Sequence, residues 1–120
     1  MTIAPDGTLW VADWGNSRLQ HLGADGSVID VIGPFPPETP GAMERPNDIA
    51  IDADGRLWVA DVQGNQVLQF AADGSFLTSF GGSGDPDLPN DPASLDFDAE
   101  GLLYVADYSE NVVLVFRPTN

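Results

Sequence analysis

Carboxylates are the side chains of this sequence that could do chemistry. Its 120 residues include 19 Asp and Glu but only 4 basic residues, all of them Arg, which gives a formal net charge of −15. Asp96, Asp98 and Glu100 stand at alternating positions just before Gly101, and Asp107 follows eleven residues after Asp96. Calcium loops of the D-x-D-x-D-G type use such spacing, because it arranges oxygen ligands around a sharp glycine turn. The stretch is therefore a calcium look-alike.

The residue types give little support to other catalytic chemistry. The chain has no Cys and a single His, His21. Without Cys there are no disulfides, no thiol catalysis and no thiolate metal site. The sequence contains neither a G-x-S-x-G nucleophile motif nor a plausible Ser–His–Asp set. We therefore predict no catalytic residue in this chain and expect a protein that is not an enzyme.

One eight-residue phrase occurs three times. It reads DGTLWVAD at residues 6–13, DGRLWVAD at 54–61 and EGLLYVAD at 100–107. Its glycines, Gly7, Gly55 and Gly101, are 48 and 46 residues apart, and other landmarks keep the same spacing. A period in the forties is typical of propeller architectures, in which each repeat forms one small sheet.

Each repeat is predicted to form four short strands. In the second copy they cover residues 48–52, 56–60, 66–70 and 76–80, separated by turns rich in Asp and Gly, which indicate hairpins. Residues 57–60 (LWVA) are apolar on both faces, whereas an antiparallel strand with one wet face should alternate. Each sheet must then lie between two neighbours, as a propeller blade does. We predict an all-β fold, a partial propeller of about eleven strands in four-stranded antiparallel meanders.

An Asp closes the repeated phrase in every copy: Asp13, Asp61 and Asp107. A carboxylate just before a turn can accept hydrogen bonds from the backbone N–H groups of that turn, so we assign these residues a structural role. The repeat also weighs against calcium, because the equivalents of Asp96 are Ala50 and Thr2. We predict a hairpin with extra acids there and no metal.

The repeats divide the chain into a single partial propeller domain, residues 1–120. Blade one covers residues 1–33, blade two 46–81 and blade three 92–117, with inter-blade loops at 34–45 and 82–91. Both loops are long, acidic and rich in Pro and Gly. Loops often carry the binding residues of a rigid scaffold, and proline reduces the entropy lost on ordering them. We expect binding at these loops and at the mouth of the channel by Glu38, Arg45, Asn47, Asp48, Asp85, Asp87 and Asp91.

The sequence PNDIAIDADGRLWVAD at residues 46–61, together with NSRLQHL at 16–22 and the D-G-S turns, resembles the NHL repeat. The resemblance covers nearly the whole chain, with just under three repeats. It implies a six-bladed propeller, which would need about twice this length. We therefore expect either a piece of a longer protein or a homodimer in which two chains close one ring.

The alternative is a fragment of a six-bladed propeller enzyme whose metal site lies mostly outside this chain. Residues 46–50 and 16–18 resemble amidating lyases, which hold zinc through channel histidines, but we expect His21 on a third strand away from the axis. Pro46 and Asn47 resemble part of the metal site of gluconolactonases, yet the matching position in the next repeat is Ala93, which cannot bind a metal. We expect no cofactor here, and a divalent metal only if the ring is completed.

Charge limits the partners. A net charge of −15 repels phosphate backbones and anionic membranes, so we expect no nucleic-acid or membrane binding. No apolar run reaches the ~18 residues of a membrane span, no signal peptide is visible, and the compartment is not indicated. We predict a non-catalytic scaffold that binds a protein or small-molecule ligand through its acidic inter-blade loops.

Overall fold

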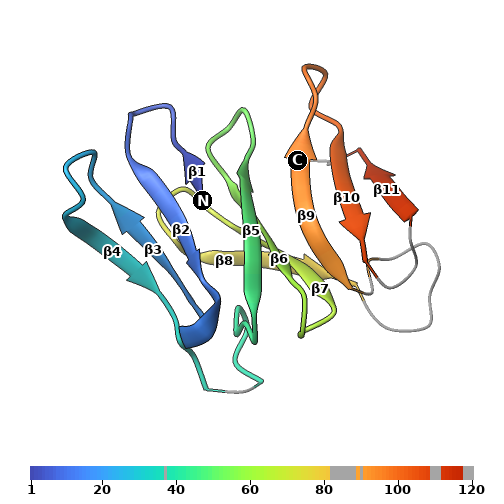
Figure 1. Ribbon diagram of the computed structural model, residues 1–120, viewed down its shortest axis with the longest axis horizontal. Coiled ribbons are helices and arrows are strands. Elements are labelled where there is room, and N and C mark those ends of the chain that lie inside the picture. The colour runs from blue at the N-terminus through green and yellow to red at the C-terminus, as the bar shows by residue number, and fades with distance from the viewer. Residues whose placement is uncertain (37, 82–88, 90, 109–111, 118–120) are drawn as a thin grey trace.

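The computed structural model describes residues 1–36, 38–81, 89, 91–108 and 112–117. Within these ranges, eleven strands form three antiparallel sheets that lie side by side (Figure 1). The helical structure there is limited to the short 3-10 turn η1 (Trp14–Asn16), and no helix in the described ranges is long or apolar enough to cross a membrane. The predicted all-β fold of propeller blades with about eleven strands is confirmed.

Each sheet is a meander whose strands pair in chain order. The first sheet consists of β1 (Thr2–Ile3), β2 (Leu9–Asp13), β3 (Arg18–Leu22) and β4 (Val28–Ile32). The second consists of β5 (Pro46–Ile51), β6 (Leu57–Asp61), β7 (Gln66–Phe70) and β8 (Phe76–Phe80). The third consists of β9 (Pro92–Phe97), β10 (Leu103–Asp107) and β11 (Val112–Phe116). We call these sheets blades one, two and three, and their first strands β1, β5 and β9 the inner strands.

Blade two follows the predicted strands closely, and the differences have a physical reason. β7 and β8 have the predicted bounds, whereas β5 covers residues 46–51 instead of 48–52. Asp52 leaves the strand because its carboxylate turns back to accept a hydrogen bond from the Arg56 N–H (2.9 Å). β6 extends to Asp61, which still pairs with Gln66 across the next hairpin.

In blades two and three, an Asp carboxylate closes the hairpin between the first and second strands. Asp52 accepts two backbone N–H bonds from its turn, and Asp98 does the same in blade three. Gly55 lies at the tip of the turn with φ of 82°, a conformation that glycine adopts without steric cost. Blade one has Ala4 at the equivalent position, and there Asp6, inside the turn, accepts a hydrogen bond from the N–H of Thr8, the residue before β2.

Blade two is packed on both faces, as the apolar pattern of its second strand predicts. Val59 and Leu68 are fully buried and face blade one. Trp58 faces blade three, where its ring meets Phe97 edge to face at a centroid distance of 5.9 Å. Such edge-to-face pairs stabilise a core beyond the burial of apolar area. The central blade therefore holds its two neighbours through two separate cores.

A carboxylate is built into the packing around Trp58. Asp52 accepts hydrogen bonds from Trp58 Nε1 (3.0 Å) and Arg56 Nε (2.8 Å). Burial raises the pKa of Asp52, but the hydrogen bonds from these side chains and from the turn outweigh burial, so its pKa is lowered overall. Asp98 has an equivalent partner in the Tyr104 hydroxyl (3.1 Å), and its own pKa is lowered, chiefly by the hydrogen bond from the Leu102 N–H.

Acid should destabilise this fold through its turn carboxylates. The pKa values of Asp6, Asp25, Asp52, Asp73 and Asp98 are all lowered in the folded chain. A lowered carboxyl pKa stabilises the folded state above the unfolded value of about 3.9, and this stabilisation is lost as the pH falls through the folded pKa. We expect the free energy of unfolding, measured by urea denaturation followed by circular dichroism, to fall steadily below about pH 4.

The Asp52→Asn variant provides the control. It removes the most buried of these carboxylates, so it should be less stable than the wild type at neutral pH and lose less on acidification. A wild-type unfolding free energy that stays constant or rises between about pH 5 and pH 3 would contradict the role given to these residues.

Candidate functional site

The loop between blades one and two has a defined structure of its own. It begins after β4 with a cis peptide bond at Gly33–Pro34 and leads into β5. An internal turn is closed by the Thr39 N–H, which donates to the Pro36 carbonyl (3.2 Å). Gly41 has φ of 92°, and a Cβ atom there would lie only 3.2 Å from Phe76 on β8. Glycine therefore lets the loop pack closely against the outer strand of blade two.

The end of this loop is fixed by the carboxylate of Asp61. Its two oxygens accept hydrogen bonds from the N–H groups of Glu44 (2.9 Å) and Arg45 (2.8 Å), from the N–H of Gly64 (3.0 Å) and from Gln66 Nε2 (3.1 Å). Asp61 is fully buried, where hydrogen bonds to an ionised acceptor are strong. One carboxylate thus joins the inter-blade loop to the turn between β6 and β7.

Blade one holds the same loop from the other side. Ser17 Oγ donates a hydrogen bond to the Glu44 carbonyl (2.8 Å). The Arg45 guanidinium lies over the ring of Trp14, 4.1 Å from the ring centroid, in a cation–π contact. On the side of blade two, the backbone carbonyl of Arg45 accepts a hydrogen bond from the Val62 N–H (3.1 Å). The loop is therefore attached to both of the blades that it connects.

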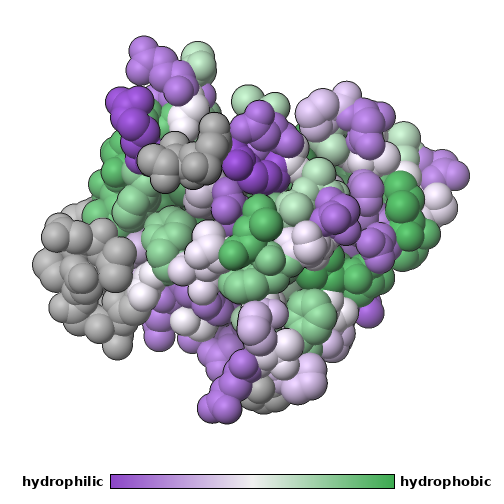
Figure 2. All heavy atoms as spheres, turned by 180° about the vertical axis from the view of Figure 1, so that it is seen from behind, coloured by the Kyte–Doolittle hydropathy of each residue, from purple (hydrophilic) through white to green (hydrophobic). Residues whose placement is uncertain are grey.

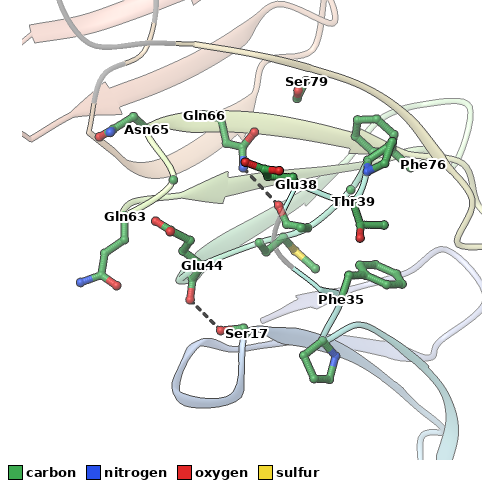
Figure 3. A pocket seen from close by; sticks show the side chains of 16 residues that line it. Ser17, Phe35, Glu38, Thr39, Glu44, Gln63, Asn65, Gln66, Phe76 and Ser79 are labelled. Carbon is green, nitrogen blue, oxygen red and sulfur yellow. Dashed lines mark hydrogen bonds between the residues drawn. The ribbon is translucent and has the colours of Figure 1, made fainter.

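The loop, the β6–β7 turn and β8 border an open groove of about 1010 Å³ (Figure 3). Phe35 and Phe76 lie on one side of this groove, and Gln63 and Asn65 on the other. Its remaining lining residues come mostly from the loop: Ser17, Pro34, Glu38, Thr39, Pro40, Gly41, Ala42, Met43, Glu44, Gly64, Gln66 and Ser79. Two of these described lining residues are Glu and none is Lys or Arg. The groove therefore suits a ligand with an apolar part and positive charge.

Asn47 and Asp48, which we predict to bind a ligand, form hydrogen bonds between the inner strands. Asn47 Nδ2 donates to the Ala93 carbonyl (2.7 Å). The Asp48 carboxylate accepts the N–H of Leu95 (2.9 Å) and that of Ile49 (3.0 Å). A second hollow of about 430 Å³ lies beside them, lined by residues 1–2, 48–51 and 95–97 of the inner strands. These two side chains therefore hold blades two and three together next to this hollow.

The other predicted binding residues lie in different places. Glu38 lines the groove, and Arg45 holds the loop beside it. Asp91 lies in the second inter-blade loop, and its carbonyl accepts the Tyr108 N–H (2.9 Å). Asp85 and Asp87 lie outside the described residues. Among the members of the predicted set that the structure describes, only Glu38 lies in the wall of the groove.

The Asp residues that close the repeated phrase have different surroundings. Asp107 is buried, as Asp61 is. Asp13 is partly exposed, and it accepts hydrogen bonds from Arg18 Nε (2.8 Å) and from Asn16 Nδ2. The pKa of Asp13 is lowered, first by the bond from Arg18 and then by Asn16. The repeat supplies the same residue each time, and the neighbouring loop decides which groups it binds.

The calcium look-alike is a hairpin in the structure. Asp96 accepts the N–H of the next residue, Phe97 (2.9 Å), and Asp98 is occupied by its turn and by Tyr104. In the ranges that the structure describes, no three His, Asp or Glu side chains are grouped so that they could hold a metal ion, and this includes Glu100. The arrangement accounts for these acids through turn formation.

Sequence reasoning missed most of the groove. Phe35, Gln63 and Phe76 line it but were not among the predicted residues. One signal was present, because Phe35 is the single aromatic residue of the loop at 34–45, among Pro, Gly and acidic residues. His21 lies on β3 as expected, where its ring stacks on Trp10 at a centroid distance of 4.2 Å.

Comparison with known protein families identifies a repeat in the second blade. The model of the NHL repeat matches residues 43–70, from the end of the inter-blade loop through β7. The chain carries an NHL repeat. This confirms the family resemblance, and the matched NHL segment includes Asp61 together with all four residues that donate hydrogen bonds to its carboxylate. Comparison with curated proteins by sequence gives no match.

Solved structures extend the likeness beyond the NHL segment. A streptogramin B lyase superimposes with a TM-score of 0.69 at 17% identity, covering 99% of this chain and 40% of the lyase. A catalytically inactive virginiamycin B lyase from Staphylococcus aureus, solved with quinupristin, gives 0.67 at 14% identity with the same coverage. A protein of unknown function from Bacteroides caccae gives 0.66 at 24%, covering 96% of this chain and 40% of that one. At such identities the likeness concerns the fold alone.

These comparisons also show what share of a propeller the chain covers. The chain spans about 40% of the length of the structures that it matches. It is a partial propeller of three blades, one of which contains the NHL match.

Replacing Asp61 by Asn should release the loop. The amide keeps one acceptor but directs its NH₂ group at backbone N–H donors, which leaves buried donors without partners. We expect the free energy of unfolding to fall by about 3 kcal/mol in urea denaturation, because unsatisfied buried groups and lost bonds to a charge each cost about 1–3 kcal/mol.

Asp13→Asn is the matched control for this change. It removes the equivalent carboxylate from blade one, where the group is partly exposed and bonded only to Asn16 and Arg18 among the described contacts. Its loss of stability should be clearly smaller than that of Asp61→Asn. Equal losses for the two variants would show that the link from Asp61 to the loop contributes nothing.

Proposed function

We propose that this chain is a non-catalytic segment of an NHL-type propeller that binds a protein or small ligand at the groove beside its first inter-blade loop. The observation that carries the proposal is the groove of about 1010 Å³, whose wall is a loop attached to two blades. A wall that is already ordered loses little entropy when a ligand binds, so more of the contact energy remains as affinity.

The chemistry of the groove favours a cationic, partly apolar ligand. Phe35 and Phe76 offer apolar surface, and the carboxylates of Glu38 and Glu44 line the same space. The net charge of −15 attracts cations to the whole surface and increases their rate of encounter. An Arg- or Lys-containing segment of a protein has this combination of properties. The same charge supports our expectation that nucleic acids and anionic membranes are not partners.

Binding can be tested with a fluorescent peptide of alternating Arg and Leu, followed by anisotropy. We expect saturable binding that weakens as salt is added, because exposed charges are screened. The double variant Glu38→Gln/Glu44→Gln should bind about tenfold more weakly, since each lost exposed ion pair is worth up to about 1 kcal/mol. The same peptide with Glu in place of Arg should not bind.

The matched control removes the same number of charges far from the groove. Asp54→Asn/Glu100→Gln changes two exposed carboxylates on the turns that follow β5 and β9, and no residue of these turns lines the groove. This variant should bind the Arg–Leu peptide as the wild type does. If both double variants lose affinity equally, the peptide is held by net charge alone and the groove is not the site.

A second candidate function rests on the hollow beside the inner strands. It measures about 430 Å³ and includes the carboxylates of Asp48 and Asp96 in its lining. In a completed ring this hollow would face the axis, where a propeller enzyme could hold a divalent metal supplied with ligands from other blades. Calorimetric titration with Mn²⁺ tests this role. Binding that Asp96→Asn abolishes would support an enzyme fragment, and binding that Asp96→Asn leaves unchanged would argue against this hollow as the metal site.

A further inference from the structure

Phe35, in the wall of the groove, has an aromatic side chain that the fold does not use. It is 37% exposed, it belongs to neither apolar core, and its ring meets no other ring among the described residues. Pro34 and Pro36 stand on either side of it, so the backbone that carries the ring has little freedom to lose. An exposed ring held in this way is suited to contact a ligand.

Glu38, in the same loop, has a backbone conformation that its residue type rarely adopts. Its φ is 70°, and the described residues include only two other non-glycine residues with positive φ, Ser17 and Asn65. All three line the groove. Ser17 and Asn65 share one turn position, four residues after the repeated Asp, whereas Glu38 belongs to the irregular loop. Backbone strain of this kind concentrates at binding positions, which makes Glu38 a candidate for contact with the ligand.

The carboxylates of the groove are not used inside the molecule. None of the ion pairs between described residues involves Glu38 or Glu44. Figure 3 shows Glu38 between the side of the groove with Phe35 and Phe76 and the side with Gln63. Ring faces and an ionised acceptor therefore border the same space.

A guanidinium group matches this combination better than an ammonium group does. Guanidinium is planar and weakly hydrated, so its faces stack on aromatic rings while its N–H donors point outward in the plane, toward carboxylates. The side-chain amide oxygens of Gln63 and Asn65 offer further acceptors on the far side of the groove. An ammonium group is a compact, strongly hydrated charge with no face to stack on a ring. Elsewhere in this chain, the guanidinium of Arg45 already stacks on the ring of Trp14.

Net charge alone does not select the ligand of the groove. Hydrophilic side chains are spread over the face seen in Figure 2, and a net charge of −15 attracts cations to the whole surface. Arg and Lys side chains carry the same charge, so this attraction treats them alike. A preference for one of them must come from the rings and acceptors of the groove itself.

We propose that the groove recognises an arginine side chain of a partner protein and discriminates against lysine. The guanidinium stacks on Phe35 and donates hydrogen bonds to the carboxylate of Glu38. Phe35 is then the residue that determines specificity, and Glu38 supplies the opposite charge. This inference rests on the proposed function, because it names the group that occupies the same groove.

Two peptides of equal charge isolate the preference. One is the Arg–Leu peptide, and the other is a copy in which every Arg is replaced by Lys. In the anisotropy measurement the wild type should bind the Lys–Leu peptide about tenfold more weakly, because a stacked guanidinium keeps its hydrogen bonds to a carboxylate and an ammonium group does not stack.

Phe35→Leu removes the ring and keeps an apolar side chain. Because Phe35 lies outside both cores, the variant should unfold at the wild-type urea concentration, and it should bind the two peptides with nearly equal affinity. Tyr108→Leu is the matched control. Tyr108 is 76% exposed and does not line the groove, so this variant should keep the preference for the Arg–Leu peptide.

The possible results separate this inference from the proposed function. Equal binding of the two peptides by the wild type would overturn the arginine inference and leave the proposed function standing. A preference that survives Phe35→Leu would overturn it as well, because the ring would not be its cause. Failure of both peptides to bind would overturn the proposed function and this inference with it. Free arginine should displace the Arg–Leu peptide more effectively than free lysine at the same ionic strength, and equal displacement by the two amino acids would count against guanidinium recognition.

Discussion

The buried carboxylate of Asp61 fixes the position of the loop between blades one and two. Asp61 collects four hydrogen bonds from the inter-blade loop, from the β6–β7 turn and from Gln66. A buried charge deprived of such partners is strongly destabilising, so the loop, the turn and β6 must stay together. The loop in turn forms a wall of the groove. The shape of the candidate site therefore depends on a residue that does not line it.

The repeat shows how one position can be used in more than one way. Asp13 closes the same phrase as Asp61, but it bonds to side chains of its own turn and stays partly exposed. The aromatic position of the phrase varies similarly: Trp58 bonds to Asp52, whereas Trp10 stacks on His21. A repeated sequence thus fixes the backbone and leaves the polar partners to local context.

The backbone elements of this chain could be predicted from its sequence, whereas the contacts of its polar side chains could not. The strands were predictable because turns rich in Asp and Gly separate short apolar runs, and the stacking of the sheets was predictable because residues 57–60 are apolar on both faces. The groove was not predictable, because an irregular loop has no periodicity that indicates where the side chains of Phe35 and Glu38 point. Asn47 and Asp48 were predicted to bind a ligand because they stand near the axis. Bonds across to β9 could not be anticipated without knowing how closely two inner strands approach.

The missing carboxylate of blade one has a consequence for how the molecule opens. With Ala4 in place of Asp52 and Asp98, and with only two residues of β1 paired to β2, little holds the first strand to its sheet. Local opening there breaks few bonds, whereas opening at β6, buried on both faces, requires the whole molecule to unfold. Amide protons should accordingly exchange with solvent first in β1 and last in β6. The propeller segment therefore has a gradient of local stability that runs from β1, where it is lowest, to β6, where it is highest.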